Sequence, residues 1–356
     1  MDEELRRATA RAMGHESWDE VVVLGGGRGG AYLATKDGVA RVVKVHRPDD
    51  PYRGRRERAA LVALGGAAGT PSLLAESDDP AFVVMSVVEG EGSVADALLG
   101  SDAGVAHGAV VRWAQALGAV HAAGSPEVRT SFADALAERG PDLPARSLAD
   151  DFAAAAEMYA AALDDLGLPP HTRALDELRA LPAALADDDH EVLSPADTCP
   201  DNNVVGADRV RLIDFEHAEL RHRAWDVAYL LAPWPSCWCA WTLPHEVAEA
   251  GIAAYCAAVG EAVRPQQLTR DLEVATLGWQ AMTPAWFLAG ALEDDDAGAG
   301  PRRPARRAFV LHRLDAVASS TSNPHLAALG GDLAATLRGR WGDVRLEAAP
   351  AFRREP

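Results

Sequence analysis

The sequence contains almost no lysine. Only Lys36 and Lys44 are lysines, and the other basic residues among its 34 are arginine. The chain is also short of positive charge overall, because 53 acidic residues give it a formal net charge of −19. Nucleic-acid phosphates require a basic surface, so this charge argues against a nucleic-acid partner. It is compatible with a cationic substrate that is drawn by long-range attraction.

Long apolar runs are missing as well. The longest candidate for a membrane span, residues 276–292, is interrupted by Gly278, Gln280 and Pro284. The N-terminal segment MDEELRRATARAMG has the polar pattern of a helix and lacks the charged-then-apolar pattern of a signal peptide. We therefore expect a soluble, cytoplasmic protein with no membrane partner.

Cysteine is scarce. The four cysteines are Cys199, Cys237, Cys239 and Cys256, and in the cytoplasm they should stay reduced. Cys237 and Cys239 could form a zinc site together with Cys199. Zinc sites of this kind usually contain a C-x2-C pair or a close histidine. The sequence offers neither beside these residues, so we do not favour a thiol-bound metal.

Residues 193–216 carry the most chemical information. In LSPADTCPDNNVVGADRVRLIDFE, Asn202 follows Asp197 by five residues, and Asp214 ends a run with strand character. Phosphoryl transfer requires one carboxylate that accepts the proton of the attacking hydroxyl, and oxygen ligands that hold Mg²⁺ on the nucleotide phosphates. These three residues could supply both. For the Asp-x4-Asn spacing alone, an Asx-rich turn between strands is the more common explanation.

The N-terminal third could supply the phosphate site. A short strand-like run at 21–24 leads into Gly25, Gly27 and Gly30, which have the spacing G-x-G-x-x-G. A dinucleotide site of the Rossmann type would require a helix directly after the glycines. Here two strand-like runs follow, up to residue 45, and this order matches the glycine-rich loop that kinases fold over ATP phosphates.

Lys44 lies at the end of the second of these runs. In a chain that otherwise uses arginine, a lysine on a strand facing a glycine loop indicates a compact ammonium between phosphate oxygens, where a guanidinium fork does not fit. Glu57 is the only carboxylate of an amphipathic helix predicted at 55–64, and it could pair with Lys44 and orient it.

A further apolar strand, which begins at Ala81, ends in a connector at 86–90. Backbone groups of Ser86 and Val88 could meet an adenine edge there. An ordinary core strand is the simpler interpretation of this run when it is taken by itself.

The rest of the chain, after residue 124, is rich in alanine and has a helical period. We predict helices over 132–139, 147–166, 172–187, 245–260, 266–292, 302–319 and 324–339. Six of the nine tryptophans lie between 225 and 286, where they could stack on a flat ligand, although filling the core is their more common role. We expect the tail after Trp341 to be loosely held.

In this order, the motifs resemble those of the aminoglycoside phosphotransferase family (the phosphotransferase enzyme family), a branch of the protein-kinase-like superfamily. The resemblance runs from about residue 20 to residue 235. It implies a two-lobed α+β fold, with a small antiparallel β-rich N-lobe over 1–85, a hinge over 86–90 and a large, mainly helical C-lobe over 91–356. Within the C-lobe it implies a catalytic loop at 193–203, a metal-binding strand at 210–216, and acceptor-pocket helices at 131–190 and 240–340.

The resemblance also implies a role for each matching residue. Asp197 would be the catalytic carboxylate, and Asn202 and Asp214 would be Mg²⁺ ligands. ATP would be bound by the glycine loop, by the hinge, and by Lys44 at its α- and β-phosphates. Asp226, which is placed to begin a helix, would brace the catalytic loop.

One departure from the family lies in the catalytic loop. Where the family has His-Gly before the catalytic carboxylate, this chain has Pro195 and Ala196. The family histidine mainly organises the loop, so its replacement need not remove catalysis. It does indicate a divergent subgroup.

Three functions are compatible with these residues. The leading hypothesis is an ATP- and Mg²⁺-dependent phosphotransferase that acts on a hydroxyl of a small molecule. The second is the same reaction on Ser or Thr of a peptide in a natural-product pathway, where another enzyme of that pathway could be a partner. The third is a nucleotide-binding pseudokinase that regulates a partner. Pro195 and Ala196 motivate the third hypothesis. The joint presence of four residues argues against it: Lys44, Asp197, Asn202 and Asp214.

Overall fold

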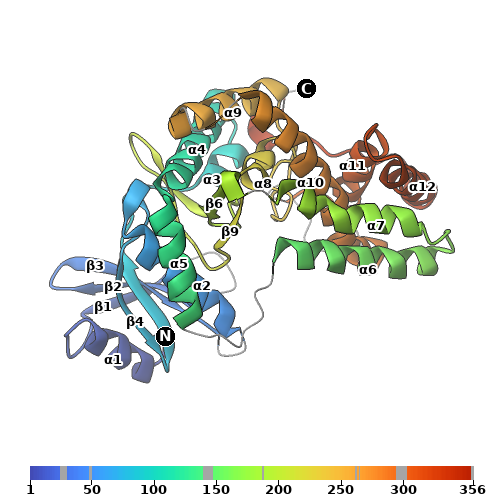
Figure 1. Ribbon diagram of the computed structural model, residues 1–356. Helices are drawn as coiled ribbons and strands as arrows, with labels where there is room; N and C mark the ends of the chain where they lie inside the picture. The colour runs from blue at the N-terminus through green and yellow to red at the C-terminus, as the bar shows by residue number, and fades with distance from the viewer. Residues whose placement is uncertain are drawn as a thin grey trace.

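The computed structural model describes residues 1–24, 30–47, 50–138, 147–186, 188–260, 263, 265–293 and 303–353. A small antiparallel sheet forms the N-terminal part, and a larger, mainly helical part follows it (Figure 1). The two-lobed α+β fold implied by the resemblance is therefore confirmed. In the described part of the chain, no helix is both long and apolar enough to span a membrane.

The N-terminal sheet contains five strands in the order β1-β2-β3-β5-β4. They are β1 (Glu20–Val23), β2 (Gly30–Lys36), β3 (Val39–Val45), β4 (Leu73–Asp78) and β5 (Ala81–Ser86). The sequence predicted each of these strands except β4. Asp37 and Gly38 turn the chain between β2 and β3 with φ of 49° and 75°, the left-handed conformation that a two-residue hairpin turn requires.

Alternation along β3 decides where Lys44 points. Val43 is fully buried beneath α1 (Glu3–Ala12) and Trp18, which cover one face of the sheet. Successive side chains of a strand point to opposite faces. Lys44 therefore points to the other face, where it meets α2 (Pro51–Leu64).

The helical part is built around α4 (Ala103–Ala123), which packs along α9 (His245–Val259). The other helices of the described residues are α3 (Val94–Leu99), α5 (Pro126–Glu138), α6 (Leu148–Leu166), α7 (Thr172–Ala180), α8 (Ala224–Val227), α10 (Pro265–Glu293), α11 (Arg306–Ala318) and α12 (Pro324–Trp341). Short 3-10 turns are η1 (Ala67–Gly69), η2 (Leu181–Leu185), η3 (Asp188–His190), η4 (Ala228–Leu230) and η6 (Pro350–Phe352). Figure 1 shows α6, α7 and α12 together at the end of the molecule that lies far from the sheet.

Each of the seven predicted helices corresponds to a helix of the structure. They are α5, α6, α7 with η2, α9, α10, α11 and α12. The sequence missed α4, because this helix is buried on most of its surface and has no broad polar face that would reveal its period.

Two short strand pairs hold the central loops of the helical part. They are β6 (Glu191–Ser194) with β9 (Glu219–His222), and β7 (Asn203–Val205) with β8 (Val210–Leu212). The Ile213 amide donates to the Asn202 carbonyl oxygen at 3.1 Å. The chain that enters β7 and the chain that leaves β8 therefore lie side by side.

The C-terminal tail is fixed to the helical part, and the expectation that it is loosely held was wrong for 342–353. The Thr242 amide donates to the Glu347 carbonyl oxygen, and the Ala349 amide donates to the Thr242 carbonyl oxygen, each at 3.0 Å. Ala349 and Ala351 are buried. Backbone pairing and burial of small apolar side chains hold this segment, and neither produces a pattern that is visible in the sequence.

Gly278 of α10 allows close packing beneath the central helices, and its substitution gives a first prediction. A Cβ at this position would lie 2.6 Å from ring atoms of Trp225 and 2.9 Å from Phe152. We expect Gly278→Ala to lower the free energy of unfolding by about 1–3 kcal/mol, as overpacking does. Gly290→Ala is the matched control in the same helix, because nothing lies within 4 Å of its Cβ position, and it should stabilise by about 0.5–1 kcal/mol. Urea unfolding of both variants tests this, and equal effects would contradict it.

Candidate active site

Lys44 lies among three carboxylates. Its Nζ is 3.2 Å from Glu57 Oε1, 2.6 Å from Asp214 Oδ1 and 2.9 Å from Glu216 Oε2. The predicted pair of Lys44 with Glu57 is therefore present. The other two carboxylates come from the segment after β8, so this one ammonium joins the sheet to the helical part of the molecule.

The charges of this cluster shift one another's pKa values. Burial alone would lower the pKa of Lys44, but Glu57, Asp214 and Glu216 outweigh it and raise that pKa above its ordinary value. Burial favours a neutral Glu57, yet Lys44 and His46 hold the pKa of Glu57 below its usual range. The His46 Nε2 atom lies 3.2 Å from Glu57 Oε2. Lys44 and Glu57 therefore stay charged together.

Asp214 sits in an unusual backbone conformation. Its φ of 68° is in the left-handed region, which Asp tolerates better than most residues. Phe215, the next residue, is fully buried and anchors the chain there. Burial raises the pKa of the Asp214 carboxyl, although Lys44 opposes this shift. Such a strained, partly desolvated carboxylate is typical of a functional position.

The loop that carries Asp197 begins with a tight turn. The Asp197 amide donates to the Pro195 carbonyl oxygen at 2.8 Å, across Ala196 with its φ of 60°, as in a three-residue γ-turn. The Ala196 amide donates to Ser194 Oγ at 2.8 Å. Asn202 Nδ2 donates to the Asp197 carbonyl oxygen at 2.9 Å. This bond fixes the Asn202 amide against the main chain of the loop.

A buried ionic network braces this loop from behind. Arg221 donates to the Ala196 carbonyl oxygen at 3.0 Å and pairs with the carboxylate of Asp226. The second oxygen of Asp226 lies 3.1 Å from His121 Nε2, and His121 Nδ1 lies 2.9 Å from Tyr255 Oη. Asp226 thus reaches the loop through Arg221. The sequence interpretation missed both Arg221 and His121, because nothing marks them locally as partners of Asp226.

The carboxyl group of Asp197 has a pKa close to neutral pH. Its Oδ1 atom is buried and has no hydrogen-bond partner among the described residues. Burial, followed by the negative charges of Asp214 and Asp201, raises the pKa of Asp197 to about 7. A group with such a pKa can accept a proton from a hydroxyl at physiological pH.

A cavity of about 540 Å³ opens beside Asp197. Tyr229, with Trp279 and Trp286 of α10, contributes aromatic surface, and Asp151 of α6 contributes a carboxylate. Trp279 and Trp286 therefore lie where a ligand could meet them. Trp279 is nevertheless buried apart from this lining, and Trp225, Trp234 and Trp241 are buried in the core without lining the cavity.

The predicted adenine and phosphate contacts are only partly within the described residues. Gly25 and Gly27 lie outside them, whereas Gly30 begins β2. Ser86 ends β5, and its amide already donates to the Ser72 carbonyl oxygen at 3.0 Å. Val88 lies in the connector that follows, between β5 and α3.

The connector after β5 also touches the strand pair that borders the catalytic loop. A Cβ at Gly90, whose φ is 149°, would lie 2.5 Å from the Val205 carbonyl oxygen. Glycine therefore permits the connector to lie directly against β7.

Two cysteines near Asp197 are joined in a disulfide. Cys199 and Cys237 are bonded, with their Cα atoms 6.0 Å apart, within the usual span of such a bond. The expectation that all cysteines are reduced was wrong for this pair, because folding brings together two loops that are 38 residues apart in the sequence. Two of the three sulfurs considered for zinc are thereby used, and Cys239 is a buried cysteine outside this disulfide.

The sequence profile of the phosphotransferase enzyme family matches residues 20–266. The chain belongs to this family. A comparison with curated protein sequences found no match.

Solved structures of other phosphotransferases share the fold of this family member. A choline/ethanolamine kinase family protein from Mesorhizobium loti is 17% identical, with a TM-score of 0.57, over 93% of this chain and 100% of that one. The choline kinase LicA from Streptococcus pneumoniae is 13% identical, with a TM-score of 0.55, over 92% and 99% of the two chains. The aminoglycoside phosphotransferase APH(2")-IIa, solved with streptomycin and ATP, is 16% identical, with a TM-score of 0.53, over 85% and 93%. At these identities the likeness establishes the protein-kinase-like fold alone.

The buried pair of Arg221 and Asp226 generates a second prediction. Asp226→Asn leaves the Arg221 guanidinium without its main counter-charge, so we expect the free energy of unfolding at pH 7 to fall by about 3 kcal/mol. Arg221 and His121 hold the pKa of Asp226 below its ordinary value against the effect of burial. Asp226 therefore stabilises the fold above its unfolded-state pKa of about 4, and this stabilisation is lost as the pH falls from there through the folded-state pKa. The difference in stability between wild type and Asp226→Asn should therefore shrink on acidification.

Glu157→Gln is the control for this prediction, since Glu157 forms an exposed pair with Arg179 and such pairs contribute little. Denaturant unfolding of the two variants at pH 7 and below pH 4 provides the measurement. A similar loss of stability in both variants at pH 7 would remove the special role assigned to Asp226.

Proposed function

We propose that this phosphotransferase uses ATP and Mg²⁺ to phosphorylate a hydroxyl group of a small molecule. The observation that carries the proposal is the joint arrangement of Asp197 and the Lys44 cluster. Asp197 is a carboxylate without a hydrogen-bond partner for Oδ1 among the described residues, with a cavity beside it. Lys44 lies 2.6 Å from Asp214. Membership of the family supports phosphoryl transfer to a hydroxyl.

The donor set of the cluster fits a nucleotide with its metal. Lys44 contacts three carboxylates, and Arg53 pairs with one of them, Glu216, at 2.9 Å. Three negative charges therefore face two positive ones, and negative charge is left over for a divalent cation. Asp214 and the side-chain oxygen of Asn202 would hold Mg²⁺, which prefers such oxygen ligands. The metal neutralises charge on the phosphates when bound. Lys44 would contact the α- and β-phosphates as a point charge, and Glu57 would keep Lys44 in place.

Asp197 would act on the acceptor. Its carboxylate orients the acceptor hydroxyl and takes the proton of that hydroxyl as the oxygen attacks phosphorus. The tight turn over Pro195 and Ala196 and the Arg221 contact hold the main chain of this loop. These contacts supply a brace although the family's His-Gly pair is absent.

The acceptor that we propose is an alcohol that also carries a protonated or quaternary amine. Aromatic faces attract such cations, and Tyr229, Trp279 and Trp286 line the cavity together with the carboxylates of Asp151 and Asp197. The solved structures named above include a choline/ethanolamine kinase family protein, a choline kinase and an aminoglycoside phosphotransferase in complex with streptomycin. The net charge of −19 favours cationic ligands as well.

The two alternative functions have less support. A cavity of about 540 Å³ suits a small ligand, whereas a peptide substrate of a natural-product pathway would need an extended groove. A pseudokinase that regulates a partner would not require a carboxylate with a raised pKa, such as that of Asp197, in addition to the Lys44 cluster. A partner enzyme of the same pathway would be expected only if the substrate is a peptide.

The two lysines give a matched test of nucleotide binding. We expect Lys44→Met to weaken MgATP binding at least ~10-fold, because a buried charge that contacts phosphate contributes more than 1.4 kcal/mol. Lys36→Met should leave binding unchanged, since Lys36 pairs with Asp19 at the end of β2, beside the turn to β3. Isothermal titration calorimetry measures both affinities, with and without EDTA. Equal affinities of the two variants would move the phosphates away from β3.

Asp197 gives the test of the chemistry. We expect Asp197→Asn to reduce turnover at least ~10²-fold, the scale of a lost general base, while MgATP affinity stays the same. The assay measures ADP release with choline, ethanolamine, an aminoglycoside, a neutral sugar alcohol and a Ser/Thr peptide as acceptors. Asp208→Asn, in the exposed turn between β7 and β8, should retain full turnover. Undiminished ADP release by Asp197→Asn with an active acceptor would exclude Asp197 as the base.

The same variant has an expected effect on stability that requires no acceptor. The folded-state pKa of Asp197 is raised to about 7, mainly by burial. Ionising Asp197 in the folded protein lowers the free energy of unfolding. This loss is absent below the unfolded-state pKa of about 4 and is complete once the pH has risen through the folded-state pKa. Asp197→Asn should therefore be more stable than wild type at pH 8 and equally stable at pH 4. A destabilised variant at pH 8 would contradict the assigned pKa.

A further inference from the structure

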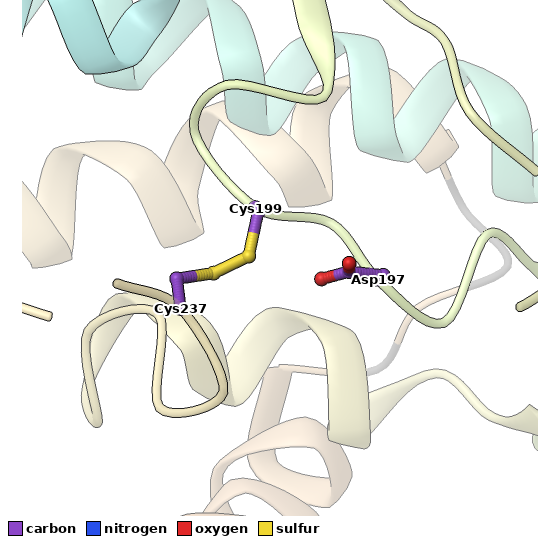
Figure 2. Close-up of side chains that lie close together, drawn as sticks. All are labelled: Asp197, Cys199 and Cys237. Carbon is purple, nitrogen blue, oxygen red and sulfur yellow. A yellow bond between two sulfur atoms is a disulfide. The ribbon is translucent and has the colours of Figure 1, made fainter. Parts of the chain in front are cut away.

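The Cys199–Cys237 disulfide joins the catalytic loop to the segment 233–242, which follows η4. Cys199 lies between Asp197 and Asn202 in the loop. Figure 2 shows the carboxylate of Asp197 turned toward the two sulfurs. A carboxylate oxygen of Asp197 and both sulfurs lie within 4.8 Å of one another. The covalent bond is therefore in direct proximity to the group that we assign as the base.

The segment at the other end of the disulfide is firmly held and borders the cavity. Trp234 and Cys239 are buried. Ser236, next to Cys237, lies 3.0 Å from Tyr229 Oη, and both residues line the cavity. Through Cys237, the catalytic loop is thus fixed to the wall against which an acceptor would lie.

Arg221 holds the catalytic loop at Ala196, before the carboxylate. After Asp197, the main chain of the loop is also held by the Asn202 side chain, which donates to the Asp197 carbonyl oxygen, and by the Ala95 amide, which donates to the Pro200 carbonyl oxygen. The disulfide adds a covalent attachment to the segment that borders the cavity. After the carboxylate, the Trp238 indole donates to Asp201 Oδ2 at 2.7 Å, an exposed contact at the far end of the turn. The Asp197 Oδ1 atom has no hydrogen-bond partner among the described residues. The orientation of this side chain therefore depends on how rigidly the main chain is held on both sides.

We propose that the Cys199–Cys237 disulfide is a positioning crosslink of the active site, which makes turnover, but not nucleotide binding, depend on oxidation of this cysteine pair. The inference rests on the proposed phosphotransferase function. In this chain, which has Pro195 and Ala196 before the base, the disulfide replaces a side chain that would otherwise organise the loop. Transfer is sensitive to such positioning, because a displacement of about 1 Å can cost ~10²-fold in rate.

Nucleotide binding should be independent of this bond. Lys44, Glu57 and Asp214 lie on β3, on α2 and after β8, and none of these elements is held by the disulfide. Contacts other than the disulfide hold the loop beside Asn202, the proposed metal ligand. The Asn203 side chain donates to the Pro200 carbonyl oxygen at 2.9 Å and accepts from the Val94 amide at 3.0 Å, and the Asn202 amide donates to the Cys199 carbonyl oxygen at 3.0 Å.

Reduction by a dithiol has a defined balance. A thiolate of the reagent attacks one sulfur of the disulfide, and the sulfur–sulfur bond breaks to release the other cysteine as a thiolate, which takes up a proton. The second thiol of the reagent then resolves the mixed disulfide. The reagent ends as a cyclic disulfide, and Cys199 and Cys237 end as two thiols. Both cysteines are buried, so the reaction should be slow in the folded protein.

Thiol counting tests whether the bond forms. The protein is purified without reductant, denatured, alkylated with iodoacetamide and weighed by mass spectrometry. We expect two labels, on Cys239 and Cys256, and four after reduction. Four labels without reduction would overturn the proposal.

Kinetics tests the role of the bond. Once an acceptor is found, we expect dithiothreitol to lower kcat at least ~10-fold, while the MgATP dissociation constant changes less than ~3-fold. Reoxidation should restore kcat, which a loss caused by unfolding would not allow. The double variant Cys199→Ser/Cys237→Ser should match the reduced enzyme and no longer respond to dithiothreitol. Cys256→Ser, with its partly exposed thiol on α9, is the control and should behave as wild type.

The outcomes separate this inference from the function on which it rests. Oxidised enzyme that turns over acceptor, with the same kcat after verified reduction and in the double variant, would overturn the positioning role alone. Oxidised wild type that releases no ADP with any acceptor would contradict the proposed function and the inference with it. A parallel loss of kcat and MgATP affinity on reduction would show a general structural role and would also overturn the proposal.

Discussion

The position of one buried ammonium determines much of this active site. Lys44 links β3 to α2 through Glu57, and to the segment after β8, where Asp214 and Glu216 lie. These three carboxylates outnumber Lys44 and Arg53, which pairs with Glu216, and keeping the remaining negative charge from water costs free energy unless further positive charge is present. The raised pKa of Asp214, which burial causes, reflects that cost. Metal bound on a nucleotide would remove it.

The loop that carries Asp197, the proposed base, is braced by a network that is distinct from the Lys44 cluster. Asp226 is fully buried and reaches the loop through Arg221, with His121 on its other side. On the far side of Asp197, the Cys199–Cys237 bond holds the loop to the wall of the cavity. Burial raises the pKa of the Asp197 carboxyl. The attachments of the loop on both sides of Asp197 determine where this side chain points. Binding and chemistry are thus supported by different parts of the fold.

The sequence predicted those features that leave a local pattern. Lys44 stood out because the chain is otherwise built with arginine, and most helices stood out by their period. β4 was missed because its run is short and partly polar, and α4 because it is buried on most sides. Arg221 and the disulfide could not be predicted, since each joins residues whose proximity arises only from the tertiary fold. The fold class was thus accessible from sequence, whereas the bracing of the catalytic loop was not.

The fate of the terminal phosphate of ATP tests the central claim most directly. The claim is that the Lys44 cluster presents ATP to an acceptor hydroxyl that Asp197 deprotonates. With [γ-³²P]ATP, Mg²⁺ and a range of amino alcohols, the label can be followed by thin-layer chromatography. The account predicts that label appears on an organic phosphate ester of one acceptor class, in amounts equal to the ADP formed. Label found solely as inorganic phosphate, or retained on ATP with every acceptor, would contradict it.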